Sequence, residues 1–140
     1  MSEILAIQEK IEHILEKSCL NRFQIKKAVS YQLIANNQLS LKVDLHGLNL
    51  EETKDIIERL FNTKKLPISV IELVHGYKRG TVLKDYIEKD FRHARLDIGR
   101  HRIDNEGVTI LYLKPWDDVL KEDNKPKTPL KKAKTQLKNL

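Results

Sequence analysis

Apolar residues recur at helical spacing along the first part of the chain. The first stripe consists of Ile4, Ile7, Ile11, Ile14 and Leu15, and a second consists of Ile25, Ala28, Val29 and Leu33. This periodicity predicts two helices, the second running to about Ala35, where Asn36 and Asn37 end it. Residues 1–37 are therefore predicted to form a helical extension. It packs either on the rest of the chain or on a second copy, which would make a homo-oligomer.

Alternation with a period of two begins directly after this segment. Every second residue from Leu39 to Leu45 is apolar, which predicts a strand with one apolar face, ended by Gly47. Asn49 and Glu52 have the spacing of a helix N-cap and its capping-box partner. The following Ile68–Val74 is almost continuously apolar, which predicts a strand covered on both sides. A strand, helix and strand of these lengths form a parallel, right-handed βαβ unit.

A second helix and two more strands complete the predicted domain. The helix carries an apolar stripe of Leu83, Tyr86, Ile87 and Phe91. Strands are expected at about residues 94–103 and 108–113, with a hairpin turn at residues 105–107. The order β-α-β-α-β-β predicts an α/β fold of two layers over residues 38–116. Residues 117–140 are predicted to be a flexible, lysine-rich tail, since six lysines and no acid follow Asn124.

Composition and charge limit which kinds of binding partner and which cellular compartment are expected. The chain has 140 residues and a formal net charge of +6, which raises the odds of a polyanionic partner to roughly even. Cys19 is the only cysteine, so no intramolecular disulfide can form, and a cytoplasmic location is the simplest expectation. Its apolar neighbours predict that Cys19 is a small buried residue. No apolar run is long enough to span a membrane, so no membrane partner is expected.

Polar residues collect where the two parallel strands end. Asp44 and His46 close the first strand and His75 closes the second, and ligands of open α/β sheets bind beyond such carboxyl ends. Asp44 and His46 are two residues apart, so they share a face and the carboxylate can orient the imidazole. Alternatively, Asp44 caps the turn and His46 is incidental. His75 is either a second acid/base group or a buried histidine that hydrogen-bonds to the neighbouring strand.

The loop after His75 has the composition of a phosphate site. Two glycines bracket two cations at the start of a helix, and the alternative is a simple glycine turn with solvated cations. The candidate nucleic-acid-binding residues are Gly76, Lys78, Arg79, Gly80, Lys84, Arg100 and Arg102. The two arginines could instead protect an edge strand. Trp116 is expected to seal the end of the core. Histidines and acids lack the spacing of a zinc site, so no structural metal is predicted.

These motifs resemble the Smr (small MutS-related) family, of the stand-alone bacterial type. Asp44-Leu45-His46-Gly47-Leu48 matches the family's opening "DLHG" motif. His75-Gly76 with Gly80 is similar to its second motif, an HGxGxG-type loop, and Gly107-Val108-Thr109-Ile110 is similar to its closing strand. The resemblance covers residues from about 39 to 114 and leaves out the helical extension and the tail.

The resemblance implies a fold similar to the C-terminal domain of translation initiation factor three. It also implies nucleic-acid binding, with endonuclease activity on DNA or on RNA associated with stalled ribosomes. Asp44 and His46 match the motif linked to cleavage, and branches with arginine at the histidine position are regarded as weak or inactive nucleases. His75, Gly76 and Gly80 match the substrate-facing loop. One departure is that Tyr77-Lys78-Arg79 replaces the loop's usual small, glycine-containing centre.

Two functional hypotheses follow from these residues. In the first, the protein is an endonuclease in which His46, oriented by Asp44, is general acid or base and His75 is a second proton carrier. RNA cleavage through the 2′-hydroxyl would need no metal, whereas DNA cleavage would favour Mg²⁺ or Mn²⁺. In the second, the protein is a non-catalytic module that binds RNA, DNA or the ribosome through the same cationic edge.

Overall fold

The fold is a mixed α/β domain, seen in a computed structural model that describes residues 2–76, 82–102 and 105–123. Its helices are α1 (Ser2–Leu15), α2 (Arg22–Ala28), α3 (Leu50–Asn62), α4 (Val82–Asp85) and α5 (Trp116–Asp123), and the π-helical turn Tyr86–Asp90 directly follows α4. Its strands are β1 (Val29–Leu33), β2 (Leu39–Asp44), β3 (Ile68–Val74), β4 (Leu96–Arg102) and β5 (Asn105–Leu113).

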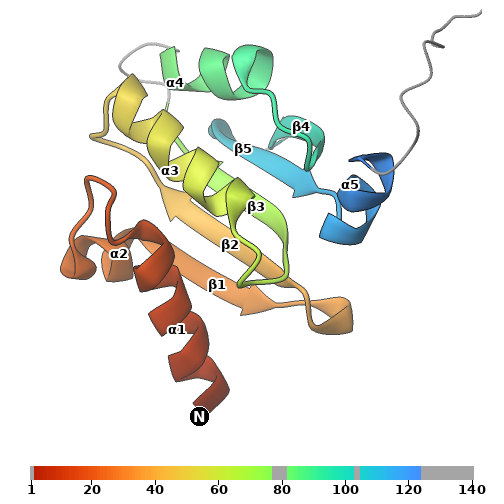
Figure 1. Cartoon of the computed structure of the whole chain (residues 1–140). Coiled ribbons are helices and arrows are strands. Elements are labelled where there is room, and N and C mark those ends of the chain that lie inside the picture. The colour runs from red at the N-terminus through yellow and green to blue at the C-terminus, as the bar shows by residue number, and fades with distance from the viewer. Residues whose placement is uncertain (1, 77–81, 103–104, 124–140) are drawn as a thin grey trace, which may run out of the picture.

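Within the described residues these strands form one sheet in the order β1-β2-β3-β5-β4. Strands β2 and β3 are parallel and are joined through α3, as the sequence predicted, while the other neighbouring pairs are antiparallel. Figure 1 shows α1 and α3 lying over the same face of this sheet. The predicted order β-α-β-α-β-β is present from β2 onward, and the α/β class is confirmed. The likeness to translation initiation factor three stays a prediction.

Helix α3 begins where the capping-box spacing predicts. The Asn49 side chain accepts from the Glu52 amide at 2.8 Å, and the Glu52 carboxylate accepts from the Asn49 amide at 3.0 Å. These two bonds satisfy amides that a helix start otherwise leaves without partners. The side chains that α3 buries against the sheet are Thr53, Ile56, Ile57, Leu60 and Phe61. The cap therefore fixes where α3 starts, just beyond the end of β2.

The prediction that both sides of β3 are covered is wrong. Ile71 and Leu73 are buried on the side of α3, whereas Val70, Glu72 and Val74 are only half-buried. Strand β2 shows the same alternation, and β5 shows it from Thr109 to Leu113, although Val108 is buried as well. Among the described residues the sheet therefore has a core face and an open face. The apolar run in β3 arises because valine also suits the half-exposed face of a sheet.

The prediction of a second helix as far as Ala35 is also wrong. Helix α2 ends at Ala28, and β1 pairs antiparallel with β2 in a register that sets Val29 opposite Val43. Residues four apart, such as Val29 and Leu33, share a face in a strand as well as in a helix, so the stripe fits both. A 3-10 turn over Ala35–Asn37 then reverses the chain.

Three further expectations concern Cys19, the packing of the first helix and the C-terminal tail. Cys19 is exposed, contrary to prediction, because the next residue, Leu20, takes the buried position. Ile11 and Leu15 of α1 are completely buried within the single chain. Helix α5 covers the beginning of the segment predicted to be a flexible tail, and residues 124–140 lie outside the described part. None of the helices described is long and apolar enough to cross a membrane.

Candidate functional site

Asp44 and His46 form a hydrogen-bonded pair at the carboxyl end of β2. Nδ1 of His46 lies 2.7 Å from Oδ1 of Asp44, and the His46 backbone amide donates to the same oxygen at 3.0 Å. The side chain of His46 is 80% exposed and that of Asp44 is 41% exposed. Asp44 therefore does both things that the sequence analysis considered: it caps the turn and it holds the imidazole.

This contact fixes which nitrogen of His46 is available. A carboxylate oxygen only accepts, so Nδ1 carries the hydrogen in the 2.7 Å contact. In the neutral ring Nε2 is then the unprotonated nitrogen, and the exposure of the side chain leaves it open to solvent. An imidazole oriented in this way can take a proton from a bound hydroxyl or water.

The turn that carries His46 is held from both sides. Leu45 is completely buried, and its amide donates to the Val74 carbonyl of β3 at 2.8 Å. Gly47 follows with φ of +86°, a conformation that residues with a Cβ rarely adopt. A buried residue before the histidine and a glycine after it turn His46 outward while anchoring its backbone.

His75 closes β3 in a different environment. It is 8% exposed; Nε2 lies 2.7 Å from the Thr109 hydroxyl of β5, and Nδ1 lies 2.8 Å from the Gly76 carbonyl oxygen. Thr109 is completely buried, and its hydroxyl oxygen lies 2.7 Å from Oε2 of Glu88. These are the contacts of the second alternative for His75, a buried histidine bonded to the neighbouring strand.

The structure does not bring His75 together with the Asp44/His46 pair. Asp44 lies opposite Val74 in the β2–β3 register, so both point to the open face. His75, one residue further on, points to the core face. The two histidine–glycine motifs share one edge of the sheet, but their side chains lie on opposite faces.

The remaining predicted residues divide into described and undescribed ones. Gly76 adopts φ of +75°, and its amide and that of His75 donate to the Gly107 carbonyl at 3.0 Å and 2.9 Å. Lys84 is half-buried on α4. Arg100 is exposed in β4, with its guanidinium 5.9 Å from the ring centroid of Tyr112.

Of the other predicted residues, Arg102 is described only in its backbone, at the end of β4. Lys78, Arg79 and Gly80 lie outside the described residues. The sequence analysis overlooked Thr109, which contacts Nε2 of His75, and Glu88, which contacts Thr109. A hydroxyl at a core-facing position of a strand is the signal that could have identified Thr109, because a buried hydroxyl needs a partner.

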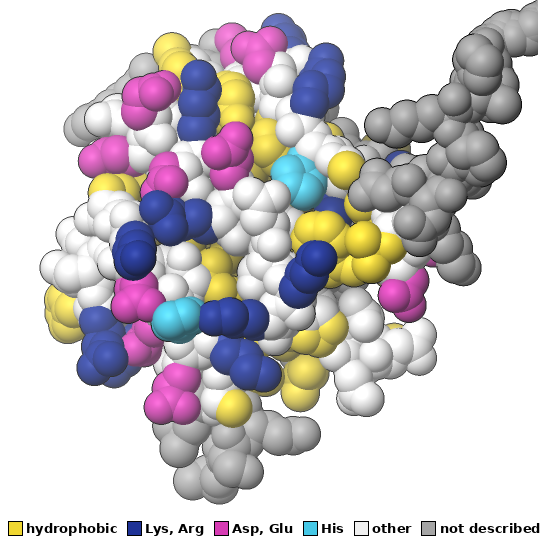
Figure 2. Space-filling view, in the orientation of Figure 1, with side chains coloured by type: hydrophobic (Ala, Val, Ile, Leu, Met, Phe, Trp, Pro, Cys, Tyr) yellow, Lys and Arg dark blue, Asp and Glu magenta, His cyan; other side chains and the backbone are white. Residues whose placement is uncertain are grey.

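Charges of both signs are interspersed over the helical side of the molecule. Figure 2 shows lysine and arginine side chains among aspartate and glutamate side chains on this face, without a region of one sign. Ion pairs account for part of the pattern, including Arg59 with Asp55 at 2.9 Å on α3. Such a mixed face does not attract a polyanion uniformly.

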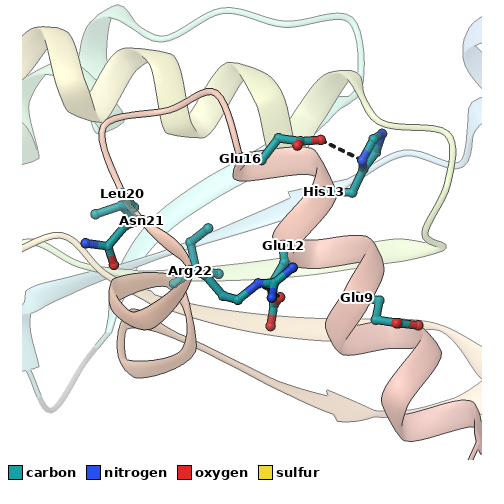
Figure 3. A pocket seen from close by; sticks show the side chains of 8 residues that line it. Glu9, Glu12, His13, Glu16, Leu20, Asn21 and Arg22 are labelled. Carbon is teal, nitrogen blue, oxygen red and sulfur yellow. Dashed lines mark ion pairs between the residues drawn. The ribbon is translucent and has the colours of Figure 1, made fainter.

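A pocket of about 270 Å³ lies between α1 and α2, and no candidate site residue lines it. Its wall includes Glu9, Glu12, Glu16 and His13, and Figure 3 shows Arg22 reaching toward Glu12. The distance from Arg22 Nε to Glu12 is 2.9 Å, and His13 pairs with Glu16 at 2.6 Å. In the described part of the chain, no group of three or more histidine, cysteine or acidic side chains could hold a metal ion.

Comparison with known proteins identifies one solved structure. The chain is similar to the Smr domain of Thermus thermophilus MutS2, with 25% sequence identity and a TM-score of 0.48. The similarity covers 53% of this chain and 98% of that domain. The solved domain carries the family name that the sequence motifs suggested. No family model matches the chain, and no curated protein matches it.

Proposed function

We propose that the protein binds nucleic acid and cleaves phosphodiester bonds at the edge of the sheet that carries Asp44 and His46. The observation that carries this proposal is the 2.7 Å contact in which Asp44 holds Nδ1 of an exposed imidazole. This arrangement leaves Nε2 of His46 free to exchange a proton with a substrate. Proton transfer by a positioned side chain typically contributes about 10²–10⁴-fold to a rate.

RNA is the substrate that needs the fewest additional groups. Nε2 of His46 would remove the proton of a ribose 2′-hydroxyl, whose oxygen attacks the adjacent phosphorus as the bond to the 5′-oxygen breaks. The protonated ring would then return its proton to the departing oxygen. DNA lacks this hydroxyl, so water must attack, and a divalent ion such as Mg²⁺ or Mn²⁺ would be required. Asp44 would orient the imidazole and stabilise its protonated form.

Phosphate binding is assigned to the loop that begins at Gly76. Lys78, Arg79 and Gly80 would hold the scissile phosphate, with Lys84 and Arg100 as further contacts to the nucleic-acid backbone. Both ring nitrogens of His75 have hydrogen-bond partners. We therefore assign His75 to shaping the loop and leave proton transfer to His46.

Cleavage assays with matched variants test the catalytic part of the proposal. End-labelled single-stranded RNA and supercoiled DNA would be incubated with protein in chelator, Mg²⁺ or Mn²⁺. His46→Ala and Asp44→Asn should lose cleavage. His13→Ala is the control, because His13 is also an exposed histidine paired with a carboxylate, at 2.6 Å from Glu16, and should retain it. Equal cleavage by His46→Ala and wild type would refute the assignment.

The competing proposal is a non-catalytic module that binds RNA, DNA or the ribosome. Its support is the chain's net charge of +6 and the exposed Arg100 beside Tyr112, a combination suited to phosphate and base contacts. Reversing Lys78 and Arg79 to glutamate should then abolish binding and flatten its salt dependence, whereas reversing Lys26 and Lys27 on α2 should not. Absence of cleavage together with intact binding by His46→Ala would favour this module.

A further inference from the structure

Three side chains from different elements form one hydrogen-bonded chain beneath the end of β3. His75 Nε2 is 2.7 Å from Thr109 Oγ1, and Thr109 Oγ1 is 2.7 Å from Glu88 Oε2. At the other end, His75 Nδ1 is 2.8 Å from the Gly76 carbonyl oxygen. Thr109 is fully buried and His75 is 8% exposed, so solvent does not substitute for these partners.

Counting the hydrogens in these contacts shows that the three side chains hold one proton more than a neutral imidazole, a threonine hydroxyl and a carboxylate would. A carbonyl oxygen only accepts, so Nδ1 of His75 must carry a hydrogen. Each 2.7 Å contact of Thr109 also requires one hydrogen, because two facing lone pairs would repel. The threonine hydroxyl supplies only one of them. The other must come from Nε2 of His75 or from the carboxyl group of Glu88.

We propose that His75, Thr109 and Glu88 share this additional proton, and that Thr109 and Glu88 are positioning residues acting through His75 on the Gly76 peptide. The chain exchanges between two forms, an imidazolium with a carboxylate and a neutral imidazole with a carboxylic acid. The two forms differ only by a shift of hydrogens along the two contacts of Thr109. In both forms Nδ1 donates to Gly76, so the ring cannot adopt the other neutral tautomer.

The consequence is that the Gly76 segment is held at two points. Its amide donates to the Gly107 carbonyl at 3.0 Å, and its carbonyl accepts from His75 at 2.8 Å. Gly76 leaves the strand with φ of +75°, a conformation that glycine adopts as readily as negative φ, so these two hydrogen bonds hold the peptide where the strand ladder ends. The importance of this peptide for activity rests on the proposed function, in which Gly76 begins the phosphate-holding loop.

Glu88 is supplied by an unusual local structure. It lies in the π-helical turn Tyr86–Asp90, which ends with the Phe91 amide donating to the Tyr86 carbonyl at 2.8 Å. A π-helical turn inserts a residue relative to an α-helix and so re-aims the side chains after it; such turns are frequent at functional sites. The neighbouring Lys89 interacts with Asp85, at 3.7 Å, on the same helical segment.

Nitrogen NMR of the imidazole groups in the full chain at pH 7 tests the proton count. The variants are Thr109→Val, which removes the hydroxyl at nearly constant volume, Thr109→Ser, which keeps it, and Glu88→Gln. Wild type and Thr109→Ser should show a protonated Nδ1 and an Nε2 signal shifted toward the imidazolium value. Thr109→Val should give a neutral ring.

Glu88→Gln removes the additional proton while keeping the two hydrogen bonds of Thr109. Its amide group can donate to Thr109, which then donates to Nε2, so both contacts persist without an additional proton. His75 should accordingly be neutral in this variant, with Nδ1 still protonated. An unprotonated Nδ1 in wild type, or ring signals that Thr109→Val leaves unchanged, would overturn the proton-sharing chain.

The positioning role is tested separately by cleavage. A small displacement of a substrate-holding segment lowers rates by up to about 10²-fold, so Thr109→Val should lose 10-fold or more in kcat while Thr109→Ser stays near wild type. Wild-type rates in Thr109→Val would refute the positioning role. If wild type cleaves nothing, the proposed nuclease fails, while the NMR result still decides the proton chain.

Discussion

Arg95 is a buried cation whose replacement by lysine should measurably destabilise the protein. The side chain is 2% exposed; Nε donates to the Lys114 carbonyl and Nη2 to the Ile68 carbonyl, both at 3.0 Å. The guanidinium carbon also lies 4.8 Å from the centroid of the Trp116 ring. These contacts join the start of β3, the end of β5 and the start of α5 through one planar group.

The expected loss can be worked from these contacts. A lysine ammonium cannot reproduce the flat fork, so Arg95→Lys should lose one hydrogen bond to a charged donor, about 1.5–3 kcal/mol. It also weakens the interaction with the Trp116 ring, about 0.5–2 kcal/mol. Nη1 is buried and has no hydrogen-bond partner among the described residues, so its removal offsets about 1 kcal/mol. The net free energy of unfolding should fall by about 1–4 kcal/mol.

Urea denaturation provides the measurement, and Trp116 is the only tryptophan, so its fluorescence reports on this junction. Far-UV circular dichroism would follow the whole fold in parallel. Arg92→Lys is the control, because Arg92 is exposed, and its stability should stay within about 0.5 kcal/mol of wild type. A change below about 0.5 kcal/mol in Arg95→Lys would refute the reasoning.

The same variant should acquire a pH dependence. Burial already lowers the pKa of the Arg95 guanidinium, and the same surroundings would lower the pKa of a lysine ammonium. The unfolded chain would keep an ordinary lysine pKa of about 10.4 and bind more protons than the folded state below that value. The stability of Arg95→Lys should therefore rise with pH between the lowered pKa of the folded state and about 10.4, and wild type should not show this rise.

Three further perturbations have defined outcomes. Gly99→Ala places a Cβ 2.6 Å from Cδ2 of the buried Leu111, so the urea midpoint should fall, by about 1–3 kcal/mol in stability. Burial, and then the charge of Arg95, lower the pKa of His93 below 6.5 in the folded state. Stability should therefore be complete above pH 6.5 and decline as the pH falls below it; His93→Gln should lose this decline in equilibrium unfolding. Gly47→Ala has free space but a φ of +86°, so thermal unfolding should report a loss of about 1–2 kcal/mol.

The sequence predicted the elements whose local signals agree with their burial. Helix α3 combines a capping box at Asn49 with an apolar stripe that the structure buries. Its local signals and its packing therefore agree on a helix that begins after Asn49. The parallel β2–β3 unit follows from that helix and the strands on either side of it. The error at β1 shows the opposite situation, because Val29 and Leu33 satisfy both periodicities and only pairing with β2 decides between them.

The candidate site was predictable in its residue types but not in its geometry. Two histidine–glycine motifs at the ends of parallel strands correctly indicated one edge of the sheet. The face that each side chain takes depends on the register between the strands, and no local pattern specifies it. The contacts of His75 with Thr109, and of Thr109 with Glu88, are harder still to predict from sequence, because these residues come from a strand and a helical turn that meet only in the folded chain.

The register explains why the two motifs form two sites instead of one. Asp44 lies opposite Val74, and a shift of one residue would have placed Asp44 opposite His75 with both side chains on the same face. That shift would also have moved Leu41 and Val43, which are completely buried, out of the core. Core packing therefore separates an exposed imidazole, suited to proton exchange with a substrate, from a buried imidazole with no free nitrogen. This edge of the sheet can then combine the exposed acid–base group of His46 with a loop whose first residue, Gly76, is held by His75. Neither arrangement disturbs the other.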